Sequence, residues 1–422
     1  MIEREMDYRG SKSIIEGNIF VKEQRVDGSW RGIYNPLLRC TLMGFERNCS
    51  KRLFMNYSFS QKQSFGTVFE VKQTLPRKHS NQNPFLANIK LINFVLYKQE
   101  LLHIRNISNT SLKDRHTLGM SGWWLTGFVD AEGCFRLSIL KNPSYKEGVN
   151  EVLPFKPRLY FQIGLHRKDE LILKSIQFLL GVGKIYKSRP DLYELQVSSI
   201  KDISAIINHF DNYPLITQKF ADYKLFKQAF NIIINKEHLT KEGLAKLISI
   251  KASMNLGITP LLKKAYPNII PIARDVVNQE IPDPDWLAGF TTGEGCFLIR
   301  IFNSSSSRLG LRVQLRFQIT QHCRDKILMD NIVKYLDCGY ISIRNDIVDF
   351  YVTNYTDIAE KIIPFFAKYS ILGVKMENYN DFKLAATLFQ NKEHLTEEGL
   401  EKIKVIKSNM NSYRVSNAND DN

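Results

Sequence analysis

The chain has 422 residues, 44% of them hydrophobic and 24% charged, which favours two or three folded units over one small domain. Its 58 Lys and Arg against 43 Asp and Glu give a formal charge of +15, which leaves open both a polyanion partner and a basic protein with no nucleic-acid role. Six cysteines without a CxxC pair give little support to disulfides or structural zinc, and no uncharged apolar run is long enough to span a bilayer.

The N-terminal region, 1–120, has little regular hydrophobic period, and stretches such as "YSFSQKQSF" are typical of linkers or disordered chain. Residues 1–115 hold 19 basic and 10 acidic residues, so the other 307 residues hold 39 and 33. The region has neither a secretory apolar segment nor the pattern of a transit peptide. We expect a largely irregular leader; its removal, or its folding as an independent basic domain, remains open.

The rest of the chain is a duplication. "WLTGFVDAEGCF" (Trp124–Phe135) returns as "WLAGFTTGEGCF" (Trp286–Phe297), and "FQIGLHRKDELIL" from Phe161 returns as "FQITQHCRDKILM" from Phe317, 156 residues later. The repeat predicts a first half over 121–255 and a second half over 286–413. The proline-rich stretch 256–285 reads as a stiff linker, and 414–422 as a disordered tail.

Each copy has the same expected order of elements. A short helix is followed by two strands with period-2 alternation, an amphipathic helix, a second strand pair and closing helices. The predicted fold class is therefore α+β, with two antiparallel sheets that are each covered on one face by helices. The other face of each sheet would expose Arg, Gln, Ser, Thr and Tyr side chains, which localises the basic charge.

The repeated phrase predicts two helices that pack against each other. Gly127 and Ala131 lie four residues apart on one helical face, and Gly289 and Gly293 match them in the second copy. Small residues on one face let two helix backbones approach closely. Each helix is expected to end at its glutamate, with the next glycine as the left-handed cap at the C-terminus.

This packing places Glu132 and Glu294 at the same end of the paired helices. The helix dipole there disfavours each carboxylate by about 0.3–1 kcal/mol, and the two like charges repel each other. A shared divalent cation would compensate, and oxygen ligands suit Mg²⁺; alternatively each glutamate pairs with a nearby lysine. Asp130 corresponds to Thr292 in the second copy, so we interpret Asp130 as an ordinary helix-end residue without a chemical role.

The residues "LTGFVDAEG" and "LAGFTTGEG", in this repeat, resemble the signature of the LAGLIDADG homing endonucleases in their two-motif, single-chain form. The resemblance covers about 121–413 and is greatest to the fungal mitochondrial intron-encoded branch. It implies a monomeric saddle of two αββαββα halves whose sheets enter the DNA major groove. It further implies Mg²⁺-dependent cleavage of both strands across the minor groove, which leaves short 3′ overhangs.

The resemblance also implies site residues. The last acids of the two motifs, Glu132 and Glu294, would be the metal ligands and catalytic acids, and the carbonyls of Ala131 and Gly293 would join the metal shell. A glutamine near the scissile phosphate corresponds to Gln321, whereas the first copy has Leu165 there. The family lysine that follows each second strand pair corresponds to Lys219 and Lys375. The alternative is that both are ordinary surface lysines.

DNA contacts are expected from polar residues of the strands, because strand ribbons enter the major groove, where Arg pairs with guanine and Gln with adenine. Some of these residues would contact phosphates only. Since the copies differ at most positions, the target should be asymmetric and span roughly 20 bp. The predicted readers are Arg136, Ser138, Arg158, Tyr160, Gln162, Lys184, Tyr186, Gln196, Arg300, Arg312, Gln314, Arg316, Gln318 and Arg344.

The sequence thus predicts a mitochondrial, site-specific double-strand DNA endonuclease that promotes the mobility of its host intron. The main alternative is a maturase on the same scaffold that binds group I intron RNA and assists splicing. A DNA-binding protein that has lost its metal chemistry is a third alternative. Because each motif keeps its glutamate, we favour cleavage over these two alternatives.

Overall fold

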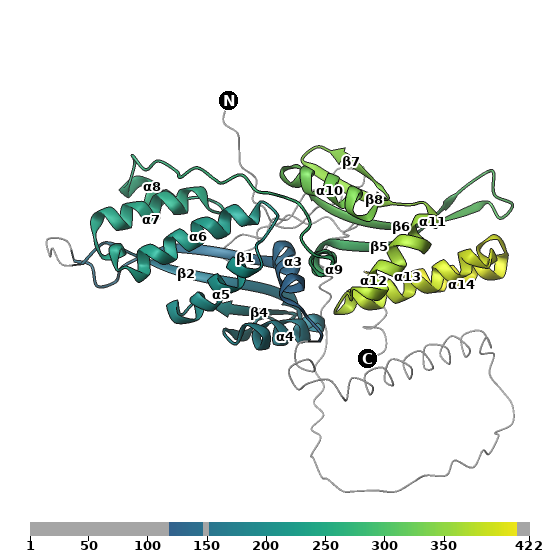
Figure 1. The fold of residues 1–422 in the computed structure, drawn as a ribbon, viewed down its shortest axis with the longest axis horizontal. Helices are drawn as coiled ribbons and strands as arrows, with labels where there is room; N and C mark the ends of the chain where they lie inside the picture. Colours follow the sequence, from purple (N-terminus) through teal and green to yellow (C-terminus); the bar gives the residue numbers. More distant parts are fainter. Residues whose placement is uncertain (1–117, 147–151, 412–422) are drawn as a thin grey trace, which may run out of the picture. The chain divides into compact units, whose positions relative to one another are not determined.

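The computed structural model describes residues 118–146 and 152–411, and both halves have the same order of elements (Figure 1). The first half comprises α3 (Gly122–Glu132), β1 (Gly133–Lys141), β2 (Phe155–His166), α4 (Glu170–Leu180), β3 (Lys184–Arg189), β4 (Leu192–Val197), α5 (Ile200–Asn212), α6 (Lys219–Ile234) and α7 (Lys241–Ser253). The second half comprises α9 (Pro284–Glu294), β5 (Gly295–Asn303), β6 (Leu311–His322), α10 (Lys326–Leu336), β7 (Tyr340–Arg344), β8 (Ile347–Val352), α11 (Tyr355–Asp357), the π-helical η5 (Ile358–Ile362), α12 (Ile363–Lys368), α13 (Val374–Gln390) and α14 (Glu397–Ser408).

Each half contains one four-stranded antiparallel sheet, ordered β1-β2-β4-β3 in the first half and β5-β6-β8-β7 in the second. The pairing is equivalent in the two halves, since Phe135 lies opposite Phe161 and Phe297 lies opposite Phe317. This arrangement confirms the predicted α+β class and the duplicated αββαββα plan.

The period-2 pattern of the strands decides which face of each sheet is buried. Phe135, Leu137 and Ile139 of β1 are buried and join a core with residues of α4, α5, α6 and α7. The ring of Phe135 packs 5.4 Å from the rings of Phe210 and Phe226, measured between centroids. The helices therefore cover one face, and the alternate positions of β1, which include Arg136 and Ser138, lie on the other.

The stretch 256–285 is more structured than the stiff linker that was predicted. It contains the short helix α8 (Pro260–Ala265) and the first residues of α9, which begins at Pro284. Its Gln279 is 2% exposed and bonds to α10. The predicted tail (414–422) and all but the last three residues of the predicted leader (1–120) lie outside the described residues. None of the helices in the described part of the chain is long and apolar enough to cross a membrane.

Helices α3 and α9 lie side by side (Figure 1), and glycines determine how closely they approach. A Cβ atom added to Gly127 would lie 1.9 Å from the main-chain oxygen of Trp286, and one added to Gly289 would lie 2.0 Å from that of Trp124. A Cβ at Gly293 would lie 2.3 Å from the Cβ of Ala131. The predicted packing of the two motif helices through their small residues is confirmed.

The conformation predicted for the glycine after each glutamate is wrong. Helix α3 ends at Glu132 as expected, but Gly133 has φ −75° and ψ 153°, and Gly295 has φ −74° and ψ 153°. Both glycines are extended because each begins a strand directly. The reason for glycine is instead steric, since a Cβ at Gly133 would lie 2.4 Å from Cγ1 of Val129.

A Gly127→Ala substitution tests the helix contact. The new methyl group would collide with main-chain atoms, which cannot move aside as a flexible side chain can. We therefore expect a loss of about 1–3 kcal/mol or more in the free energy of unfolding, measured by denaturant titration. Gly164→Ala is the matched control, because its Cβ would lie 3.5 Å from the nearest atom, in ordinary contact. Equal stability of the two variants would contradict close packing of α3 on α9.

Candidate active site at the junction of the motif helices

The structure brings the two predicted catalytic acids together at the C-terminal ends of α3 and α9. Glu294 is 5% exposed and Glu132 is partly buried. A Cβ built on Gly293 would lie 3.4 Å from Oε1 of Glu132, so this carboxylate lies against the last turn of the other motif helix. The junction therefore receives one carboxylate from each half of the chain.

The two predicted lysines reach the same junction. Lys219, the first residue of α6, donates hydrogen bonds from Nζ to the carbonyl oxygens of Val129 (2.9 Å) and Ala131 (3.1 Å). Lys375, on α13, donates from Nζ to the carbonyl of Gly293 at 2.7 Å. Each ammonium thus binds the negative end of its own half's motif helix, where a cation is favoured.

Burial and mutual charge shift the protonation of these groups. Burial, followed by the neighbouring carboxylate of Glu294, raises the pKa of Glu132 to about 8, whereas Lys375 and Lys219 act in the opposite direction. Burial lowers the pKa of both lysines, although Glu132 and Glu294 favour their charged forms. Two acids that disfavour each other's charge in a buried site provide a place where a further cation would be stabilised.

The donor set fits the cation that the resemblance implies. No three His, Cys, Asp or Glu side chains gather into one cluster within residues 118–146 and 152–411. The donors at the junction are two carboxylates and the carbonyls of Ala131 and Gly293, which already accept lysine hydrogen bonds. A hard divalent ion such as Mg²⁺ commonly uses one or two carboxylates together with water and phosphate oxygens.

Gln321 lies near the end of β6 and is 2% exposed. It follows Phe317 and Ile319 on the helix-covered face of its strand, and the corresponding Leu165 is 7% exposed on β2. The difference between the halves is therefore built into the sheets. A role for Gln321 near the scissile phosphate stays a prediction.

The interpretation of Asp130 as an ordinary helix-end residue is wrong. Asp130 is fully buried and accepts hydrogen bonds from the main-chain nitrogens of Ile216 (3.0 Å) and Thr217 (3.2 Å), the hydroxyl of Thr217 (2.5 Å) and Nε1 of Trp286 (2.8 Å). Burial raises its pKa to about 6, and these hydrogen bonds oppose that effect. Asp130 therefore connects both motif helices to the segment that leads into α6.

In the second half, neutral groups connect the motif helices to the segment that leads into α13. An acid is therefore not needed at position 292. The Thr292 hydroxyl accepts from the main-chain nitrogen of Leu372 at 3.3 Å, and Nε1 of Trp124 donates to the carbonyl of Ser370 at 3.0 Å. The signal for this contact was present in the sequence, because both copies of the phrase begin with tryptophan. The partner of each indole is set only by the packing of the helices.

All fourteen predicted DNA readers lie on the sheet faces opposite the core. In the first sheet, Arg136 stacks over the ring of Tyr160 at 4.5 Å. The Tyr186 hydroxyl donates to Glu194 (2.8 Å) and lies 2.9 Å from Oε1 of Gln196. The other readers of this sheet are Ser138, Arg158, Gln162 and Lys184, and those of the second sheet are Arg300, Arg312, Gln314, Arg316, Gln318 and Arg344.

Two readers of the second sheet are held by a buried acid that sequence reasoning missed. Asp349 is 0% exposed and accepts from Nε and Nη2 of Arg344 (2.9 and 2.6 Å) and from the Gln318 amide (3.1 Å). The Thr320 hydroxyl donates to the same carboxylate at 2.5 Å. In the strand pairing, Asp349 takes the position that Glu194 takes in the first sheet. Each polar face therefore contains an acid that orients its neighbours.

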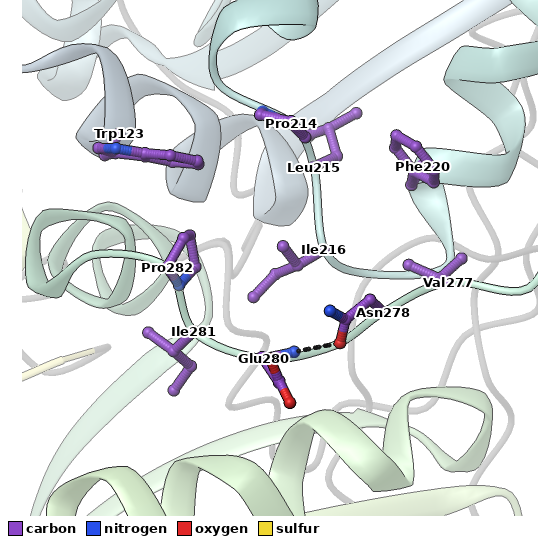
Figure 2. Close-up of a pocket in the computed structure, with 10 residues that line it drawn as sticks. All are labelled: Trp123, Pro214, Leu215, Ile216, Phe220, Val277, Asn278, Glu280, Ile281 and Pro282. Atoms are coloured by element: carbon purple, nitrogen blue, oxygen red, sulfur yellow. Dashed lines mark hydrogen bonds between the residues drawn. The ribbon is translucent and has the colours of Figure 1, made fainter.

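An apolar pocket lies beside the segment that leads into α6 (Figure 2). Trp123, Ile216 and Phe220 line it from the first half, and Val277 and Pro282 from the stretch between the halves. None of the predicted catalytic, metal or DNA-binding residues lines it. The pocket is therefore separate from the paired glutamates, but it shows that the 277–282 segment runs past 214–216.

Comparisons of the sequence agree with this geometry. The family described as LAGLIDADG endonuclease matches residues 125–230 and 287–386. Probable intron-encoded endonuclease 3 of Neurospora crassa is 37% identical over 415 residues, which cover 96% of this chain and 70% of that protein. Probable intron-encoded endonuclease 2 of the same organism is 37% identical over 351 residues, with 79% of this chain and 74% of that protein covered.

Solved structures are similar over both halves. I-SmaMI, a LAGLIDADG homing endonuclease bound to cleaved DNA, superimposes with a TM-score of 0.67 at 40% identity, covering 70% of this chain and 98% of that one. The LAGLIDADG meganuclease I-CpaMI, bound to uncleaved DNA, gives a TM-score of 0.65 at 45% identity, covering 69% of this chain and 99% of that one.

The two indole contacts make a matched pair of predictions. Trp286→Phe leaves a buried carboxylate one donor short, which should cost about 1.5–3 kcal/mol, whereas Trp124→Phe leaves a neutral carbonyl short, which should cost about 0.5–1.5 kcal/mol. Denaturant unfolding at pH 8, where Asp130 is ionised, measures the difference. A larger loss for Trp124→Phe would contradict the assigned role of Asp130.

Proposed function

The chain belongs to the LAGLIDADG endonuclease family, and we propose that it is a monomeric homing endonuclease that cuts both strands of a long, asymmetric DNA target with Mg²⁺. The observation that carries the proposal is the pair Glu132 and Glu294, one from each half, at a junction flanked by two lysines. The polar faces of two antiparallel sheets provide the DNA-binding surface.

We assign the chemistry to these residues as follows. Glu132 and Glu294 would hold the divalent cation, which when bound would stabilise negative charge on the phosphate of the DNA. The ammoniums of Lys219 and Lys375 keep the carbonyl ends of the motif helices in place and add positive charge beside the phosphate. Burial of the four groups strengthens each of these interactions relative to water.

The asymmetry of the target follows from the sheets. Ser138 and Tyr160 in the first half occupy the positions of Arg300 and Arg316 in the second. The two faces therefore present different hydrogen-bonding groups to the two half-sites. Glu194 and Asp349 hold neighbouring readers in defined orientations, which reduces the conformational entropy lost when DNA binds.

We also propose that the chain is encoded in a fungal mitochondrial intron and promotes the mobility of that intron. Its relatives carry the names of intron-encoded endonucleases, and a further relative from Podospora anserina, 36% identical over 224 residues, is described as a protein in ND4 intron 1. The target would then be the allele that lacks the intron.

The test of cleavage uses the full chain and a library of intronless-allele and randomised DNA duplexes. We expect cleavage of both strands with Mg²⁺, whereas EDTA abolishes cleavage and Ca²⁺ supports binding only. Glu132→Gln and Glu294→Gln should each lower the cleavage rate by at least about a hundredfold, because each removes one charged ligand. DNA affinity, measured in Ca²⁺, should remain near that of the wild type.

Two outcomes would contradict the proposal. Glutamine variants that cut at the wild-type rate would remove the glutamates from the chemistry. A chain that binds and splices intron RNA, but cuts no duplex in the library, would instead be a maturase.

The two acids on the polar faces, the buried Asp349 and the half-buried Glu194, give a prediction about specificity. Asp349→Asn removes the charge that holds Arg344 and Gln318, so the base preference opposite the second sheet should broaden at one or two positions, by about 1–3 kcal/mol per contact. Glu194→Gln is the matched change on the first sheet and should affect the other half-site. Cleavage profiling on a library of single-base target variants measures both, and a change in the same half-site for both variants would refute the assignment.

A further inference from the structure

In each half, one aspartate accepts a hydrogen bond from the other half, from the residue just before that half's lysine. Asp325, at the end of the 3₁₀ turn η4 (Cys323–Asp325), accepts a hydrogen bond through Oδ1 from the main-chain nitrogen of Gln218 at 2.9 Å. Asp169, at the end of η2 (Arg167–Asp169), accepts through Oδ1 from the main-chain nitrogen of Val374, also at 2.9 Å. The two contacts are equivalent, since the two aspartates are 156 residues apart and so are the two main-chain nitrogens that donate to them.

These contacts add to the local capping of the lysine helices, which in α6 includes the Thr217 hydroxyl that accepts from the main-chain nitrogen of Lys219 at 3.2 Å. Helix α6 begins at Lys219 after Gln218, and α13 begins at Val374 after Gly373; neither capping residue bonds the first turn through a side chain of its own. The first main-chain N–H groups of a helix need acceptors, and a carboxylate there is favoured by the helix dipole. Here that carboxylate comes from the opposite half of the chain.

Both aspartates lie against groups that fit them, with Asp325 fully buried and Asp169 half-buried. Asp325 is 0% exposed, and Nε2 of Gln279, from the stretch between the halves, donates to the same Oδ1 at 2.5 Å. On the other side, a Cβ built on Gly373 would lie 2.2 Å from Oδ1 of Asp169, and Gly373 has φ +67°. Glycine is therefore needed at 373 both for its left-handed conformation and to let the aspartate approach.

The contact is one residue away from each lysine. Gln218 is followed by Lys219, whose Nζ binds the carbonyl of Ala131, and Lys375 follows Val374 and binds the carbonyl of Gly293. Fixing the start of a helix fixes the Cα of its first residue, and hence the reach of the side chain. Active-site groups misplaced by about 1 Å lose on the order of a hundredfold in rate.

We propose that Asp169 and Asp325 are reciprocal positioning residues, each of which sets the lysine beside the opposite half's motif helix. The inference rests on the proposed endonuclease function. It implies that the position of Lys219 depends on an acid of the second half, and that of Lys375 on an acid of the first half. Neither lysine is therefore positioned by its own half alone. The repetition of this aspartate in "HRKDE" and "HCRDK" was visible in the sequence, but its partner was not.

The main experiment resolves the two strand cuts, using a duplex selected from the cleaved library and labelled on each strand. Asp325→Ala should slow one strand by about tenfold or more, and Asp169→Ala should slow the other strand, because each frees a different lysine. Asp325→Asn and Asp169→Asn should restore most of each rate, since the amide oxygen still accepts the N–H bond. Asp191→Ala, which removes a surface partner of Arg167, is the control for general loss of an acid.

A second readout does not require cleavage. Lys219 is 7% exposed, so acetic anhydride should acetylate it slowly in the wild type and several-fold faster in Asp325→Ala, with Lys375 unchanged in the same sample. Asp169→Ala should show the reverse. Peptide mass spectrometry measures both lysines at once, in protein whose folding is checked by circular dichroism.

The outcomes separate the inference from the proposed function. Equal slowing of both strands in both alanine variants, or lysine labelling unchanged from the wild type, would overturn the positioning role. If the wild-type chain cuts no duplex, the proposed function fails, and the labelling still decides whether each aspartate positions the opposite lysine.

Discussion

The close approach of α3 and α9 is the constraint on which the rest of the structure depends. Gly127 and Gly289 allow each helix to rest against the main chain of the other, so the two helix ends cannot be separated without breaking the junction. Because the helices are parallel partners of one duplication, their C-terminal ends coincide. The same packing that joins the halves therefore forces Glu132 and Glu294 together, in a place where both the helix dipoles and mutual repulsion disfavour them.

The protein offsets this unfavourable charge with groups from further along the chain. Lys219 and Lys375 bind the helix-end carbonyls, and the segments that bring these lysines are themselves fixed by acids: Asp130 and Asp325 hold the start of α6, and Asp169 holds the start of α13. Charge alternates from the carboxylates to the ammoniums and back to the supporting aspartates. Such a network strengthens every member in a buried site, and a single unpaired member would be costly.

How much of this could be predicted depends on whether a contact is local. The strand alternation, the small-residue face and the paired glutamates follow from spacing along the chain, and the structure has them where the sequence placed them. The left-handed conformation predicted for Gly133 and Gly295 was wrong because each motif helix is followed directly by a strand, whose backbone is extended. Asp130 was missed because its donors lie 86 or more residues away along the chain. Asp349 was missed because two of its donors, Gln318 and Thr320, lie on another strand, 31 and 29 residues away. A carboxylate's role depends on which donors the fold gives it.

Duplication explains why the two halves solve one problem differently. Each motif helix must be tied to the segment that carries its lysine, but Asp130 does so with a buried charge and Thr292 with a hydroxyl. The indole of Trp286 needs an acceptor at Asp130, whereas that of Trp124 uses a main-chain carbonyl of the other half. Both halves keep the residues that act between the halves. These are a glutamate at the shared junction and an aspartate that bonds to the other half. A residue whose hydrogen bonds serve its own half can change as long as another donor or acceptor takes its place. A residue that contacts the partner half is more constrained, because it must fit the packing of both halves.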